Sequence, residues 1–112
     1  MENSYLLVLT TCPDAEFAET LAATIVDGGL AACVNIVPGI RSIYRWKGKR
    51  ESGSEQLLLI KTRAALYERL ERAITEAHPY ELPEVIAVTI KNGLAGYFSW
   101  IDEATSGAGA GR

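Results

Sequence analysis

The chain has 112 residues, which is enough for one hydrophobic core and too few for two ordinary domains. Hydrophobic residues at 48% and charged residues at 22% match a soluble globular protein, and a formal net charge of −3 argues against binding to nucleic acid or to a membrane surface. The sequence has no apolar run of bilayer length and no basic start typical of a secretory signal, so we expect a cytoplasmic protein.

The first predicted elements are a strand and a helix. Residues 5–11 form a short continuous apolar run rich in strand formers, as in a strand covered on both faces. Pro13 suits the first helical position, an apolar stripe follows, and the glycine pair at 28–29 is expected to end the helix.

The middle of the chain predicts an unusually long hairpin. A second strand runs over residues 30–47, and Pro38-Gly39 indicates a bulge or bend within it. We expect a polar turn over residues 48–53 and a third strand over 55–62.

The last third of the chain predicts two helices and a strand. A helix over residues 64–77 carries one apolar stripe, a fourth strand covers 85–90, and a short third helix surrounds Tyr97 to Ile101. Residues 1–104 therefore form a single domain. The tail, residues 105–112, consists mainly of glycine, alanine and serine, and we expect it to be disordered.

The order β-α-β-β-α-β with an added C-terminal helix predicts an α+β protein with the ferredoxin-like, split β-α-β fold. Both long helices are expected to cover one face of an antiparallel sheet. Strand four should lie antiparallel beside strand one, and strand three is expected to run parallel to strand one. These directions would make Thr10, Thr11, Cys12, Lys61 and residues 78–84 neighbours at one edge of the sheet.

The run His78-Pro79-Tyr80-Glu81-Leu82-Pro83-Glu84 places the only histidine beside two carboxylates in a backbone stiffened by two prolines. Imidazole with carboxylates suits several transition metals. In an extended backbone the three side chains are spread by roughly 9 Å per step, so they cannot cage one ion alone. The predicted metal ligands are His78, Glu81 and Glu84 with Cys12 from the same edge. The alternative is that His78 forms local hydrogen bonds at the end of a helix.

Cys12 allows two interpretations. A helix N-terminus lowers the pKa of a thiol, so Cys12 could be an activated nucleophile, but a third orienting group is not evident. In the other interpretation Cys12 packs under the start of the helix. Cys12 and Cys33 lack the CxxC spacing, and we expect both to be reduced thiols.

The hairpin gathers basic and aromatic side chains. Five of the eleven basic residues lie on it: Arg41, Arg45, Lys47, Lys49 and Arg50. They form either an anion pocket or a charged edge that prevents indiscriminate strand pairing. Tyr44 and Trp46 share one face of the strand, and we expect a partner subunit to cover them.

These residues resemble the CutA family of divalent-cation tolerance proteins. The matching stretches are Thr11-Cys12-Pro13-Asp14, residues 30–40, residues 42–49, Leu59-Ile60-Lys61-Thr62, residues 78–84 and residues 96–101. The resemblance implies a ferredoxin-like protomer in a compact homotrimer, with hairpins that pair across subunits. It also implies an association with metal tolerance and copper binding. The trimer is similar to that of the PII signalling proteins, which bind small molecules at clefts between subunits.

Two positions depart from family members proposed to bind copper. Thr10 stands where those proteins have cysteine, and Ala77 stands where they have a second histidine. The resemblance therefore implies weak binding of a divalent cation, copper or zinc. We expect that replacing His78 by alanine would lower the metal affinity without disturbing the core.

The resemblance implies a non-enzymatic trimeric binding protein in the response to metal ions. One alternative is a PII-like sensor of a small anionic metabolite, with a cleft lined by Thr10, Thr11, Lys61, Tyr80, Tyr44 and Trp46. A second alternative is an acylphosphatase-like enzyme of the same fold. That enzyme needs a glycine-rich phosphate loop with arginine after strand one, where this sequence has Thr11-Cys12-Pro13-Asp14.

Overall fold

The structure is a computed structural model that describes residues 4–107. Its elements in chain order are β1 (Tyr5–Cys12), α1 (Ala15–Asp27), β2 (Cys33–Trp46), β3 (Lys49–Arg63), the short 3₁₀ helix η1 (Ala64–Leu66), α2 (Tyr67–Ala77), β4 (Ile86–Thr89) and α3 (Ala95–Ala104). The predicted α+β, ferredoxin-like order with an extra C-terminal helix is confirmed. Within residues 4–107, no helix is both long and apolar enough to cross a membrane.

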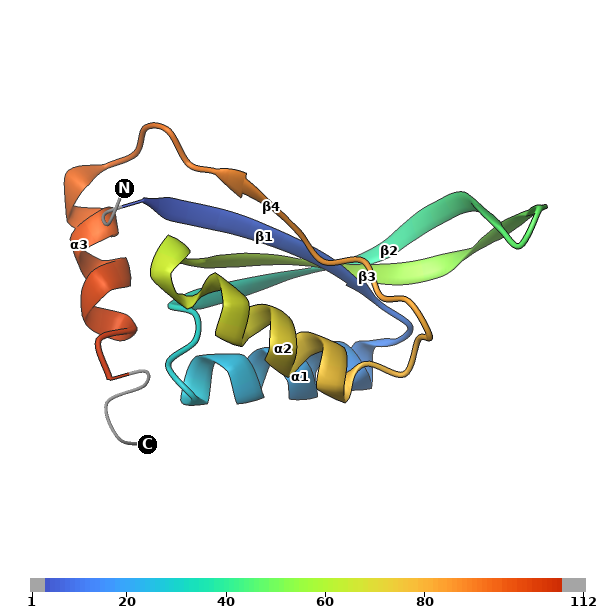
Figure 1. The fold of residues 1–112 in the computed structure, drawn as a ribbon, viewed down its shortest axis with the longest axis horizontal. Helices are drawn as coiled ribbons and strands as arrows, with labels where there is room; N and C mark the ends of the chain where they lie inside the picture. The colour runs from blue at the N-terminus through green and yellow to red at the C-terminus, as the bar shows by residue number, and fades with distance from the viewer. Residues whose placement is uncertain (1–3, 108–112) are drawn as a thin grey trace.

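The four strands form one sheet in the order β2-β3-β1-β4, in which all neighbours are antiparallel. Helices α1 and α2 lie together on one face of this sheet, and α3 lies near the start of β1 (Figure 1). The core between sheet and helices is built from Val8, Leu58 and Ile60 on the strands and Ala18, Leu21, Ile25, Leu70 and Ile74 on the helices. Each fully buried aliphatic side chain contributes about 1.5–3 kcal/mol to stability.

The opposite face of the sheet is apolar, and α3 covers only its end at the start of β1, where Phe98 stacks on Tyr5 (Figure 1). Side chains alternate along a strand, and Val8 and Leu58 point toward the helices, so their neighbours point away from them. In the ladder Leu9 stands opposite both Leu59 and Ile86. The face consists of Leu7, Leu9, Leu57, Leu59, Ile86 and Val88, all half-buried or exposed.

The direction of β3 differs from the expectation. It runs antiparallel to β1, with Tyr5 opposite Arg63 and Cys12 opposite Gln56. The crossover through α1 makes β2 parallel to β1, and the tight β2–β3 hairpin then reverses the chain. Lys61 therefore stands opposite Leu7, away from the C-terminal end of β1.

The hairpin turn is also tighter than expected. Lys47 and Gly48 have φ values of 52° and 83°, and Trp46 pairs with Lys49. Two residues with positive φ between paired strands are the pattern of a type I′ turn. Residues 49–53, expected as a loop, belong to β3. The predicted bulge is confirmed, because the register shifts between Val37 and Ile40.

The ends of the helices follow local capping chemistry. The side chain of Asp14 accepts a hydrogen bond from the Phe17 N–H at 2.8 Å, and α1 begins at Ala15. Pro13 therefore precedes the cap and does not occupy the first helical position. Helix α2 ends at Ala77, and His78 before Pro79 is extended, with φ −76° and ψ 137°.

Thr105 belongs to the folded part of the chain, although the tail was expected to begin there. It is fully buried. Its hydroxyl accepts a hydrogen bond from Arg63 Nε at 2.8 Å, and its carbonyl accepts one from Arg63 Nη2 at 3.0 Å. Residues 108–112 of the expected tail lie outside the described residues.

Candidate functional site

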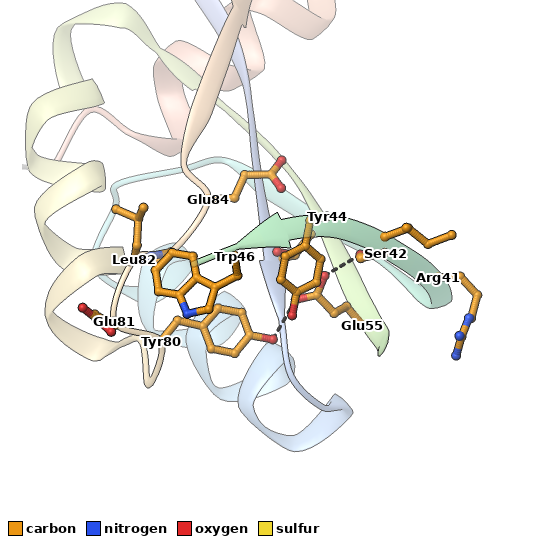
Figure 2. Close-up of a pocket in the computed structure, with 12 residues that line it drawn as sticks. Arg41, Ser42, Tyr44, Trp46, Glu55, Tyr80, Glu81, Leu82 and Glu84 are labelled. Atoms are coloured by element: carbon orange, nitrogen blue, oxygen red, sulfur yellow. Dashed lines mark hydrogen bonds between the residues drawn. The ribbon is translucent and has the colours of Figure 1, made fainter. Parts of the chain in front are cut away.

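A pocket of about 770 Å³ lies between the outer part of the β2–β3 hairpin and the loop that precedes β4 (Figure 2). Its walls come from β1, β2, β3 and this loop. The lining residues are Thr11, Arg41, Ser42, Ile43, Tyr44, Trp46, Glu55, Tyr80, Glu81, Leu82, Pro83 and Glu84. The pocket therefore joins segments that are distant in the sequence.

Glu55 is fixed at the centre of this group by two hydroxyl donors (Figure 2). The Ser42 hydroxyl donates to Glu55 Oε1 at 2.5 Å, and the Tyr80 hydroxyl donates to Glu55 Oε2 at 2.6 Å. Burial, and then the carboxylate of Glu55, raise the pKa of Tyr80 above its ordinary value. The phenol therefore stays protonated and keeps donating over the physiological range of pH.

Glu55 was missing from the predicted site residues. The sequence placed it at the start of a strand, where an exposed acid is commonplace. The antiparallel register of β3 brings it near the C-terminal end of β1, since its neighbour Gln56 stands opposite Cys12. If β3 had been predicted to run antiparallel to β1, Glu55 would have been placed beside the C-terminal end of β1.

His78 bridges two backbone segments. Its Nδ1 accepts a hydrogen bond from the Tyr80 N–H at 3.2 Å, which leaves the proton of the neutral ring on Nε2. Nε2 then donates to the Thr11 carbonyl at 2.7 Å. The ring packs edge-on against Phe17 and is 8% exposed. Both nitrogens are therefore in use, and the imidazole has no lone pair directed at an ion.

Cys12 is fully buried at the end of β1. Burial, followed by the charges of Glu55 and Asp14, raises the pKa of its thiol to about 11. A nucleophile or a metal ligand requires the thiolate, which is scarce near neutral pH when the pKa is so high. The geometry supports the interpretation of Cys12 as a packing residue under the start of α1.

The predicted cleft residues on β1 and β3 differ in position. Thr11 lines the pocket. Thr10 is fully buried, and its hydroxyl has no hydrogen-bond partner among the described residues. The Lys61 ammonium lies 3.7 Å from Cys33 Sγ and contacts Asn35 Oδ1, so it does not reach the pocket.

The loop carboxylates and the hairpin aromatics, predicted for two separate sites, line the same pocket. Glu81, Glu84, Tyr80, Tyr44 and Trp46 all line it. An exposed ion pair joins Glu81 to Lys47 in the hairpin turn. Over residues 4–107, however, no three side chains of the His, Cys, Asp and Glu types gather closely enough to hold a metal ion.

Comparison with known proteins identifies the family. Residues 6–104 match the CutA1 divalent ion tolerance protein family. This chain belongs to that family. Among solved structures, the crystal structure of CutA1 from Oryza sativa has a TM-score of 0.89 and 44% sequence identity, and the match covers 91% of this chain and 94% of that chain. CutA1 from Thermus thermophilus gives a TM-score of 0.88 at 44% identity.

Curated CutA sequences agree with the structural matches. The chloroplastic protein CutA of Arabidopsis thaliana is 48% identical over 100 residues, which are 89% of this chain and 55% of the relative. The divalent-cation tolerance protein CutA of Thermus thermophilus is 44% identical over 99 residues, which are 88% of this chain and 96% of the relative. This chain thus spans little more than half the length of the plant relatives and nearly all of the bacterial one.

Proposed function

We propose that this chain is a non-catalytic, homotrimeric protein of the divalent-cation tolerance response. The family match over residues 6–104 carries the proposal. The site supports a non-catalytic role, because the ring nitrogens of His78 are both bonded and the pKa of Cys12 is raised to about 11. Neither group is free to act as a base or nucleophile. The cytoplasmic location remains a prediction.

The uncovered face of the sheet supports a trimer. Ile86 and Val88 on the edge strand β4 are 52% and 51% exposed, and they continue the apolar surface of β1 and β3. A contiguous apolar face of this kind marks an interaction surface, and a free edge strand offers unpaired backbone groups to a neighbour. Mass measurement in solution tests the assembly. A monomer at micromolar concentration would contradict it.

We further propose that a divalent cation, copper or zinc, binds to the exposed carboxylates of Glu81 and Glu84. His78 and Cys12, the other predicted ligands, would first have to give up the contacts described above. Two carboxylates, one of them paired with Lys47, supply too few ligands for tight binding, so the site is weak. Weak binding agrees with the sequence, which has Thr10 and Ala77 where family members proposed to bind copper have cysteine and a second histidine.

The test of cation binding compares matched variants in calorimetric titrations with zinc and copper. Glu81→Gln combined with Glu84→Gln should weaken binding by about tenfold, or about 1.4 kcal/mol. Glu16→Gln with Glu19→Gln, two exposed changes on α1, should leave it unchanged. Equal affinity in the loop variant would contradict the site. Growth in elevated copper of a host lacking its own CutA protein, with and without this chain, tests the tolerance role.

A further inference from the structure

The pocket around Glu55 is far larger than a single ion needs. Its volume of about 770 Å³ falls in the range of about 300–1,000 Å³ typical of small-molecule sites. A compact dication would not find a full ligand shell there, since no trio of metal-ligating side chains converges within residues 4–107. The size of the pocket fits an organic molecule.

The charges of the lining favour a positive occupant. Three carboxylates, Glu55, Glu81 and Glu84, face one guanidinium, Arg41. Arg41 Nη2 reaches Ser52 Oγ at 3.5 Å, and Figure 2 shows its guanidinium at the far end of the group. Lys47 pairs with Glu81 at 3.8 Å. Among the described residues, neither Glu55 nor Glu84 forms an ion pair.

The aromatic side chains specify what kind of cation fits. Tyr44, Trp46 and Tyr80 gather around the pocket (Figure 2). An ammonium ion over an aromatic ring gains about 0.5–2 kcal/mol, and its alkyl groups bury apolar surface against the ring. The Lys47 ammonium already lies 5.7 Å from the centroid of the Trp46 ring, so this ring takes part in such a contact within the chain itself.

We propose that this pocket binds an organic ammonium ion with an apolar body. Trp46, Tyr44 and Tyr80 hold the body, and the carboxylates of Glu84 and Glu55 attract the charged nitrogen. In this proposal Tyr44 and Trp46 face a ligand and not the partner subunit that the sequence predicted to cover them, and the subunits meet through the apolar face of the sheet. An anionic ligand is disfavoured, because the lining is net negative and Lys61 lies elsewhere. The proposal shares Glu84 with the cation site proposed above, but Trp46, Tyr44, Tyr80 and Glu55 belong to it alone.

Three probes of similar shape separate charge from apolar contact. 2-Phenylethylammonium, 2-phenylethanol and phenylacetate are titrated into the full chain, and binding is measured by calorimetry at neutral pH. We expect the ammonium ion to bind at least about tenfold more tightly than the alcohol, and phenylacetate to bind more weakly than both. High salt should reduce this preference, since part of it is coulombic.

Matched variants locate the binding. Glu84→Gln should weaken binding of 2-phenylethylammonium by about fivefold and leave 2-phenylethanol unaffected, whereas the exposed control Glu19→Gln changes neither. Trp46→Leu should weaken both probes, and Trp100→Leu on α3 should weaken neither. A native-like circular dichroism spectrum is required of every variant.

Three results would overturn the proposal. These are equal affinity for the ammonium ion and the alcohol, tighter binding of phenylacetate, and no saturable binding of the ammonium ion up to about 10 mM. None of them bears on metal tolerance, which the zinc and copper titrations and the growth experiment decide separately. Absence of zinc and copper binding by the parent protein, together with saturable binding of the ammonium ion, would contradict the cation-binding proposal alone.

Discussion

His78→Ala should destabilise the fold without specifically removing a metal site. The imidazole satisfies the Thr11 carbonyl and the Tyr80 N–H, which lie at the end of β1 and in the loop before β4. Alanine leaves both backbone groups without this partner. From the sequence we expected the core to tolerate this change. The structure corrects that expectation, because His78 is only 8% exposed.

The size of the effect follows from these contacts. A buried polar group left unsatisfied costs about 1–3 kcal/mol, and truncation of the packed ring adds to this. Thr11 and Tyr80 also line the pocket, so we expect solvent to replace part of the lost bonding and the net loss to be about 3 kcal/mol. With a slope of about 1–3 kcal/mol per molar urea, the midpoint of unfolding falls by about 1–3 M.

Urea unfolding followed by circular dichroism at one fixed protein concentration measures this loss. His78→Gln and His78→Asn are the matched variants. Glutamine places an amide donor near the position of Nε2, and asparagine places an acceptor near Nδ1, so each should recover part of the stability. If His78→Ala is within 0.5 kcal/mol of the parent, the bridging role is refuted. The bridging role is also refuted if zinc strongly stabilises the parent protein but does not stabilise His78→Ala.

Three further predictions follow from local features. Burial raises the pKa of Cys12 from 9.0 to about 11, so its contribution to the unfolding free energy should be constant up to about pH 8 and fall by about 2 kcal/mol by pH 11, and the parent protein should lose that much more stability than Cys12→Ala in alkaline urea titrations. Gly48→Ala, at φ +83°, should cost about 1 kcal/mol in thermal unfolding, whereas Gly53→Ala should not. Ending the chain after Ala104 should lower the melting temperature by several degrees through loss of the Arg63 contacts of Thr105, whereas ending it after Gly107 should not.

The element order was readable from the sequence because each element carries its own pattern. The apolar stripe of α2, the apolar run of β1 and the Pro38-Gly39 bulge are local signals. The turn at Lys47-Gly48 was missed because glycines at 48 and 53 both offered a place to reverse the chain. The two-residue turn is favoured because the backbone twist of a type I′ turn matches the right-handed twist of the flanking strands.

The site was less readable because its contacts join distant residues. His78 and Thr11 are 67 positions apart, and Tyr80 and Glu55 are 25 apart. Such pairs depend on strand direction and register, and the error in the direction of β3 placed Lys61 at the pocket and left Glu55 out. The loop carboxylates and Tyr80 were found because one short segment carries them.

The outer half of the β2–β3 hairpin depends on its own ladder, since it extends beyond the helices (Figure 1). Backbone amides in such a segment exchange with solvent deuterium through local opening, before the core opens. The same openings offer an extended peptide to a protease. A chain outside the trimer proposed above would thus be cleaved first between residues 40 and 55. Under that proposal the hairpin would limit the lifetime of unassembled subunits.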